Sequence, residues 1–330
     1  MPNLPDDPSL LFIHQLHHQH VRDLAWCCFS APMMQELPGT ATQIFPFQQP
    51  CSHTGFTPSD TALWDWLRTL DAAPEALDKH LAQRKSTRLG IYYEALWQFY
   101  FNHHPQWQLL DYNLQIDHKG ITLGALDFLC GRDGQYFHIE TAVKFYLCNT
   151  HSQKDATEWK NWIGPNNNDR LDIKLTHLIN HQLPLHQFTQ TQKVLHAKYP
   201  HIQNWHSALC LQGYFFSPAS MCLSPDHSHP HHGHGYWWHL RDFLYFLQQT
   251  AQTETVWTLL EHQHWLSPAH IDSPDRLLTA TELSKHIQSQ LEKTKKPLLI
   301  AALIEMNSIT KTVWRESMRG FVVPDHWPDN

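Results

Sequence analysis

The sequence predicts a mixed α/β fold organised around one run of elements in the order α-β-β-β-α-β, between residues 86 and 216. Residues 86–102 repeat apolar side chains every three or four positions, as a helix with one buried face does. Residues 107–147 alternate in hydrophobicity and contain two short turns with glycine, which predicts three antiparallel strands. A helix over residues 169–183 and a strand over residues 206–216 complete the order.

The flanking segments predict further helices and strands of the same domain. Before the core, helical spacing covers residues 21–28, 59–70 and 76–83, and the Pro- and His-rich residues 1–18 are expected to be loosely held. After it, we expect a His-rich loop (227–235), helices (237–248, 281–293 and a short basic one at 311–319) and strands (255–260 and 298–306). We therefore predict one domain over residues 19–325, with its core at 86–216 and an extension at 217–325.

Composition indicates a cytoplasmic protein without a global attraction for nucleic acid. The formal net charge is −7 with neutral histidines, so binding to DNA or RNA would need a local basic patch. The seven cysteines include no CxxC pair, which favours reduced thiols. No signal peptide and no apolar run long enough to span a bilayer is evident.

Three acids and a lysine fall where this order of elements can bring them together. Glu94 lies on the first helix, Asp127 near the end of the second strand, and Glu140 and Lys144 on one face of the third strand. Carboxylates on neighbouring strands suit Mg²⁺, with Mn²⁺ as a substitute. Asp127 and Glu140 are the predicted metal ligands, Lys144 the electrostatic partner and Glu94 a supporting acid in phosphodiester hydrolysis. Alternatively, Glu140 and Lys144 form a structural ion pair, or the site is a degenerate relic.

Several of these segments together resemble a known family. RLGIYYEALW, TLGALDFL, HIETAVKFYL and LQGYFF are similar to the bacterial domain-of-unknown-function family numbered 1853, over residues 21–324. That family is grouped by resemblance with PD-(D/E)XK (restriction-endonuclease-like) nucleases. The resemblance implies a nuclease-like core with added N-terminal helices and C-terminal α/β elements.

The resemblance also implies roles for individual residues. Glu94 matches the helix acid, Asp127 the second-strand acid and Lys144 the lysine. The chain departs from the pattern at Ala142, where an acid would stand, and its acid is Glu140, roughly 7 Å further along the strand.

Other polar groups are weaker candidates for binding. Arg88, Arg170 and Lys174 stand at or near the starts of the two core helices and could contact a nucleic-acid phosphate, or form solvated helix faces. Lys311, Arg315 and Arg319 would form a basic helical stripe. The His-rich residues 227–234 could bind Zn²⁺, Ni²⁺ or Cu²⁺, but lack zinc-finger spacing.

These observations support three hypotheses about function. The first is a Mg²⁺-dependent nuclease acting on DNA or RNA. The second is a catalytically degenerate nuclease fold that binds nucleic acid or another protein. The third, which is weaker, is metal binding through the His-rich loop.

Overall fold

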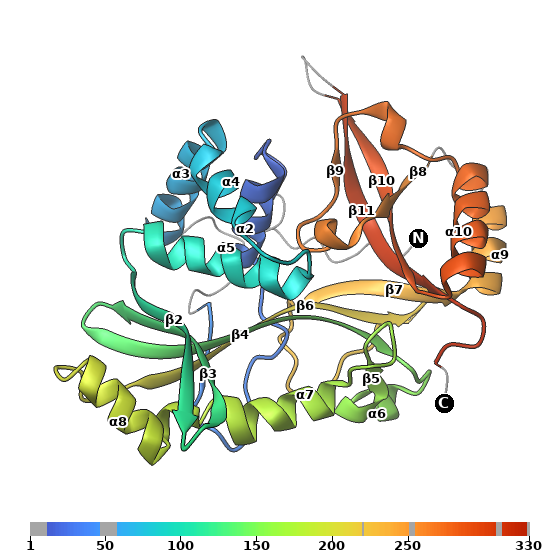
Figure 1. The fold of residues 1–330 in the computed structure, drawn as a ribbon. Helices are drawn as coiled ribbons and strands as arrows, with labels where there is room; N and C mark the ends of the chain where they lie inside the picture. The colour runs from blue at the N-terminus through green and yellow to red at the C-terminus, as the bar shows by residue number, and fades with distance from the viewer. Residues whose placement is uncertain (1–11, 47–57, 220, 251–254, 308–311, 329–330) are drawn as a thin grey trace.

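The structure is a computed structural model in which residues 12–46, 58–219, 221–250, 255–307 and 312–328 are described. A mixed sheet joins strands between Gln108 and Val323 in the order β2-β3-β4-β6-β7-β11-β10-β8 (Figure 1). Its strands are β2 (Gln108–His118), β3 (Ile121–Arg132), β4 (Gln135–Cys148), β6 (His206–Pro218), β7 (Gly233–His239), β11 (Thr312–Val323), β10 (Leu298–Asn307) and β8 (Val256–Leu260). Three two-residue strands lie beside this path: β1 (Gln43–Ile44) pairs with β6, β5 (Trp162–Ile163) with β4, and β9 (His270–Ile271) with β11.

The sheet has a parallel centre and two antiparallel ends. β2, β3 and β4 form an antiparallel meander, as predicted. β4, β6, β7 and β11 are parallel to one another, and β10 and β8 complete the sheet in antiparallel orientation. The predicted core and the C-terminal extension therefore share one continuous sheet.

Helices cover both faces of this sheet. One face carries α2 (Gln19–Phe29), α3 (Pro58–Ala72), α4 (Glu75–Ala82) and α5 (Leu89–His103), and the other carries α6 (Gln153–Ala156), α7 (Leu171–His177) and α8 (Thr189–Lys198) (Figure 1). α9 (Leu240–Thr250) and α10 (Ala280–Thr294) pack on the C-terminal strands. Alternate residues of β4 divide between the two layers, because Phe137 and Ile139 belong to the α5 core and Tyr146 and Cys148 to the α7 core. No helix in the described ranges is long and apolar enough to cross a lipid bilayer.

Two tight turns fix the register of the meander. Lys119-Gly120 joins β2 to β3, and Asp133-Gly134 joins β3 to β4. All four residues have positive φ angles, between 50° and 78°. Two consecutive residues of this kind form the type I′ turn that matches the twist of a β-hairpin, and glycine adopts it without steric strain.

The structure differs from the sequence prediction in the extension. The basic helix predicted at residues 311–319 is wrong: residues 312–323 form strand β11, and Lys311 lies outside the described residues. The helix predicted from residue 237 begins at Leu240, because residues 233–239 form β7. The stripe does not exist as a helical face, since Arg319 is 1% exposed and its guanidinium binds Glu316 and the carbonyl oxygens of Trp265 and Ser267.

Two further segments differ from the prediction. The helix expected at 169–183 is α7 followed by a π-helical turn (Leu178–Gln182), and α8 was not predicted. Short 3-10 turns occupy Trp159–Asn161, Leu185–Gln187, His262–His264 and Pro274–Arg276.

Residues 12–18, expected to be loosely held, are packed, because Ile13 and Leu16 are fully buried. Residues 1–11 lie outside the described ranges.

Gly213 permits the close approach of β6 to β4. Its φ angle is +139°, and a Cβ atom there would lie 1.7 Å from the carbonyl oxygen of Lys144. We expect Gly213→Ala to lower the free energy of unfolding by about 3 kcal/mol, since the backbone must move to relieve the overlap. Gly90→Ala on α5 is the control, because its added Cβ meets nothing within 4 Å, and helix propensity predicts a gain of about 0.5 kcal/mol. Urea unfolding of both variants measures these changes. If Gly213→Ala is as stable as the wild type, the close approach of β6 to β4 does not require a glycine.

Candidate active site

The two predicted strand acids meet where the β3–β4 ladder opens. Pairing between these strands extends from Arg132–Gln135 to Phe128–Ile139 and stops there. Beyond it, Oε1 of Glu140 accepts the backbone N–H of Asp127 at 3.4 Å. Oδ2 of Asp127 accepts the backbone N–H and the hydroxyl of Thr141, at 2.9 and 3.3 Å. Side-chain carboxylates thus replace the next rung of the ladder, and the structure brings Asp127 and Glu140 together.

Glu140 is fully buried and held by two side-chain donors. Its Oε1 lies 2.7 Å from Nε2 of His138, two residues earlier on the same strand face. Its Oε2 accepts the amide of Gln182 at 2.7 Å. The exposed fraction of Glu140 is 0%, so these contacts replace water around the carboxylate.

A second histidine determines how His138 is protonated. Nδ1 of His186 lies 2.8 Å from the carbonyl oxygen of Leu183 and 3.3 Å from Nδ1 of His138. Because a carbonyl only accepts, Nδ1 of His186 carries the proton, and Nδ1 of His138 accepts. Burial lowers the pKa of His138 to about 4. His138 is therefore neutral and donates its Nε2–H to Glu140. The sequence signal for this residue was its position two residues before Glu140 on one strand.

All three predicted acids have raised pKa values. Burial, followed by the charge of Glu140, raises the pKa of Asp127 to about 7. Burial also raises the pKa of Glu140 to about 7, against the hydrogen bonds from Asp127 and Gln182 and the charge of Lys174. The Glu94 side chain on α5 reaches solvent, but partial desolvation and the charges of Asp127 and Glu140 raise its pKa to about 7 as well. Near pH 7 these carboxyls are therefore partly protonated, because burial disfavours their ionised form.

The lysine linked to these acids is Lys174 rather than Lys144. Nζ of Lys144 forms an ion pair with Asp169. Nζ of Lys174 donates to Oε1 of Gln182 at 3.0 Å, and the same amide group donates to Glu140. The charge of Lys174 lowers the pKa of each of the three acids, while burial lowers the pKa of Lys174 itself. We call Glu94, Asp127 and Glu140 the acid cluster, and Lys174 is its associated lysine.

A π-helical turn positions Gln182 between Lys174 and Glu140. The helix widens directly after α7, and the backbone N–H of Leu183 bonds the carbonyl oxygen of Leu178 at 2.9 Å. Such turns are rare and frequently lie at functional sites. No sequence signal marked this turn.

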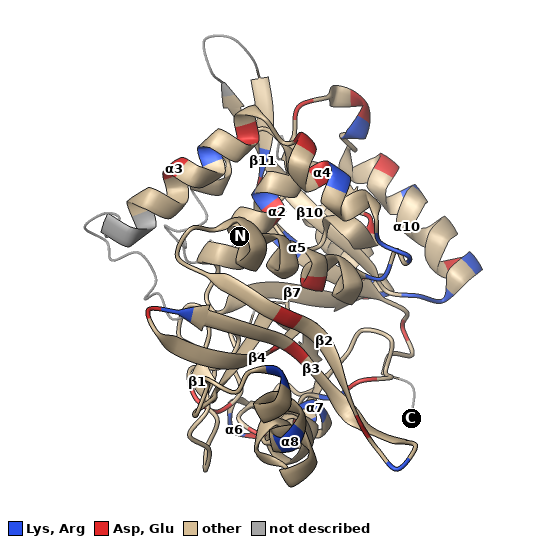
Figure 2. Cartoon of the chain, turned by 60° about the vertical axis from the view of Figure 1, so that its left-hand side comes forward, with Lys and Arg blue, Asp and Glu red and all other residues tan. Residues whose placement is uncertain are grey.

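The other predicted binding residues lie apart from the acids. Arg170 is exposed, and its Nε and Nη2 donate to Asp172 at 2.6 and 3.0 Å. Arg88 is exposed at the N-cap of α5. Basic and acidic residues are interspersed along α3, α4 and α10, and the view in Figure 2 shows no continuous basic face.

The His-rich segment is largely engaged in contacts with the rest of the protein. His227 pairs with Glu36 at 2.8 Å. His232 lies 3.0 Å from the hydroxyl of Ser224, and His234 lies 3.1 Å from that of Ser217. Within the described ranges, residues 227–234 do not place three metal-ligating atoms within 4.8 Å of one another.

The acid cluster offers carboxylate oxygens as ligands for a cation that keeps part of its hydration shell. Across the described residues, Oδ1 of Asp127 and both carboxylate oxygens of Glu94 have no hydrogen-bond partner, and Oε2 of Glu140 accepts one bond. The acids do not bring three ligand atoms within 4.8 Å of one another. This arrangement suits an ion held by one or two carboxylates and completed by water, as Mg²⁺ commonly is, and Asp127 and Glu140 would hold it.

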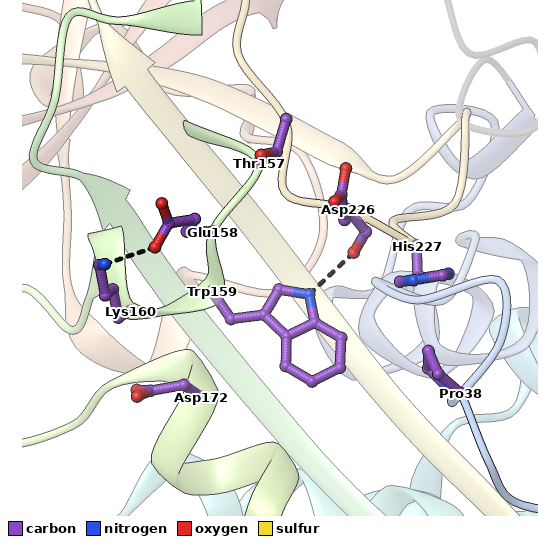
Figure 3. Close-up of a pocket in the computed structure, with 8 residues that line it drawn as sticks. All are labelled: Pro38, Thr157, Glu158, Trp159, Lys160, Asp172, Asp226 and His227. Carbon is purple, nitrogen blue, oxygen red and sulfur yellow. Dashed lines mark hydrogen bonds and ion pairs between the residues drawn. The ribbon is translucent and has the colours of Figure 1, made fainter. Parts of the chain in front are cut away.

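A surface pocket of about 340 Å³ lies elsewhere on the molecule (Figure 3). It contains the indole of Trp159, whose N–H donates to the carbonyl oxygen of Asp226 at 2.8 Å. Three acids and one lysine are among its residues, which are Pro38, Thr157, Glu158, Trp159, Lys160, Asp172, Asp226 and His227. None of the four predicted catalytic residues lines it.

The raised pKa of Asp127 makes stability depend on pH. A carboxyl whose pKa rises from 3.8 to about 7 on folding stabilises the protein when protonated, and that contribution is lost as pH rises from about 4 to 7. Asp127→Asn keeps an acceptor for Thr141 and removes the titration. We expect its unfolding free energy, relative to the wild type, to improve by roughly 2 kcal/mol between pH 5 and pH 8 without divalent ions. Denaturant unfolding at both pH values measures this difference, and a pH-independent difference would contradict the pKa assignment.

The comparisons with known proteins identify a family. The model of the family described as "Domain of unknown function (DUF1853)" matches residues 22–323. No curated protein and no solved structure matches the chain. The match covers most of the sequence, so the chain belongs to the DUF1853 family.

Proposed function

We propose that this protein is a divalent-cation-dependent phosphodiesterase acting on nucleic acid, with a PD-(D/E)XK-like core. The observation that carries the proposal is the acid cluster at the open end of the β3–β4 ladder, where three carboxylates have pKa values near 7 beside Lys174. The order of α5, the β2-β3-β4 meander, α7 and the parallel strand β6 supports the choice of fold. Perturbed acids gathered around one point are a feature of functional sites.

Each residue of the proposed site would have its own role in the reaction. When bound, Mg²⁺ would supply polarisation of the phosphodiester and a lower pKa for a coordinated water. Asp127 and Glu140 would hold the ion, and His138 and Gln182 would keep the Glu140 carboxylate in place. The ammonium group of Lys174 would stabilise negative charge developing on the phosphate. Glu94, with a pKa of about 7, could accept or release a proton near neutral pH.

A specific observation favours a second candidate function. Glu140 is 0% exposed, and both its oxygens are hydrogen-bonded within the protein. Lys144, the lysine of the expected motif, is paired with Asp169. These contacts would also suit a catalytically degenerate nuclease fold that binds nucleic acid or a protein partner.

Metal binding and cleavage separate the two candidates. We expect the wild type to bind Mn²⁺ and Mg²⁺ and to cleave DNA or RNA. Asp127→Asn should weaken the ion's affinity by about tenfold or more and reduce cleavage by about 10²-fold, because it removes a charged ligand. Calorimetric titration and a nuclease assay on single- and double-stranded DNA and RNA measure both.

Asp133→Asn is the matched control for this experiment. Asp133 is an exposed acid in the β3–β4 turn, 82% exposed, and lies outside the cluster. It should bind and cleave as the wild type does. A wild-type protein that neither binds nor cleaves would favour the degenerate fold.

The two lysines are distinguished by their substitution with methionine. We expect Lys174→Met to lower cleavage by about 10²-fold, because it removes the positive charge nearest the acids. It should also move the acidic limb of the pH–rate profile to higher pH, because the charge of Lys174 lowers the three carboxyl pKa values. Lys144→Met is the control and should change the rate by less than about tenfold. A larger effect of Lys144→Met would return the catalytic role to Lys144.

A further inference from the structure

Two histidines and an aspartate converge between α2 and α4. His18 is the N-cap residue of α2, His20 lies in its first turn, and Asp78 lies on α4. Nε2 of His18 is 3.3 Å from Oδ2 of Asp78, and Nδ1 of His20 is 2.7 Å from Oδ1. One ligand atom from each residue lies within 4.8 Å of the other two, which occurs for no other group of three among the described residues.

The backbone around these histidines is held firmly by neighbouring side chains. The carboxylate of Asp71, on α3, accepts the N–H groups of His17 and His18 at 2.8–3.0 Å. The buried guanidinium of Arg22 donates to the carbonyl oxygens of Leu16 and His17, at 3.3 and 2.6 Å. The backbone that carries His18 is therefore held in place before an ion binds.

The three side chains offer the donor set of a transition-metal site. Two imidazole nitrogens and one carboxylate oxygen are ligands that Zn²⁺ takes in proteins, with a remaining position for water. The side chains are 32–39% exposed, so an ion and its water can reach them from solvent. Mg²⁺ prefers oxygen ligands, and the site is therefore chemically distinct from the acid cluster.

The two ring nitrogens of His18 have different surroundings. Nδ1 of His18 is buried and has no hydrogen-bond partner in the described structure. Oδ2 of Asp78, 3.3 Å from Nε2 of His18, can only accept, so it favours the form of His18 with the proton on Nε2. An ion bound at Nε2 would shift the proton to Nδ1, whose lone pair no donor of the described structure uses.

We propose that His18, His20 and Asp78 bind a divalent transition-metal ion of the Zn²⁺ type, which fastens the start of α2 to α4. α4 contacts α2 in the structure (Figure 1). None of the acids of the proposed phosphodiesterase site takes part. Binding here is independent of whether that activity exists.

The test is Zn²⁺ titration of the untagged protein in competition with a chromogenic chelator. Wild type, His20→Gln and Asp78→Asn are compared with the control His17→Gln, which removes an exposed histidine next to the site and no ligand. We expect one site whose affinity falls at least tenfold in both ligand variants and stays unchanged in the control. The chain has 28 histidines, so this difference, rather than total zinc uptake, measures the site.

Thermal unfolding gives a second measurement on the same proteins. Zn²⁺ should raise the unfolding midpoint of the wild type and of His17→Gln, because an ion that binds the folded state stabilises it. The rise should disappear in His20→Gln and Asp78→Asn. Equal zinc affinity and an equal midpoint shift in all four proteins would overturn the proposal. Asp78 would then only accept hydrogen bonds from His18 and His20.

Discussion

The parallel ladder between β4 and β6 is the constraint on which the remaining structure depends. It runs from Phe137–His206 to Leu147–Phe216 and joins the meander to the C-terminal strands. β6 is buried on both faces after its first two residues, and β4 is so for most of its length, as parallel strands between helical layers are. A buried amide secures the helices to it: Gln212 of β6 accepts from Tyr93 of α5 at 2.6 Å and donates to the carbonyl oxygens of Cys27 and Ser30 at 2.9 Å.

The same ladder accounts for the position of the acid cluster. β4 continues along β6 to Leu147, whereas its pairing with β3 ends at Phe128–Ile139. The strands separate there, and backbone groups that would have paired need other partners. Asp127 and Glu140 supply them through their carboxylates. The site therefore arises from a change of strand partners, which is a property of the sheet and not of any short motif.

Local signals predicted the elements of the core, because those signals act within a few residues. The glycines at 120 and 134 marked the two hairpin turns, and the period of hydrophobicity separated α5 from the strands. Strand β11 was mistaken for a helix because charged residues at every fourth position were taken to be exposed. Arg319 is instead buried, where it bonds Glu316 and lies 4.1 Å from the ring centre of Tyr214.

Only the part of the candidate site that lies on the strands was predictable from the sequence. Alternation along β4 placed Glu140 on one face, and the hairpin brought Asp127 near it. The partner lysine depends on how the helix after β4 packs against the sheet, and the sequence contains no local signal for that contact. Lys174 reaches the acids through Gln182, which stands on a π-helical turn. Long-range packing of this kind decides which of two lysines joins a site.

The burial of Glu140 bears on both candidate functions. A fully buried carboxyl with a raised pKa destabilises the folded protein at neutral pH relative to an uncharged side chain of similar shape. His138 and Gln182 limit this effect, and a scaffold without activity could contain the same hydrogen-bonded group. Oδ2 of Asp127 has a structural role because it accepts from Thr141, whereas its Oδ1 and both carboxylate oxygens of Glu94 lack donors in the described structure. The cation that we propose would stabilise the ionised form of these acids, whose pKa values are raised mainly by burial.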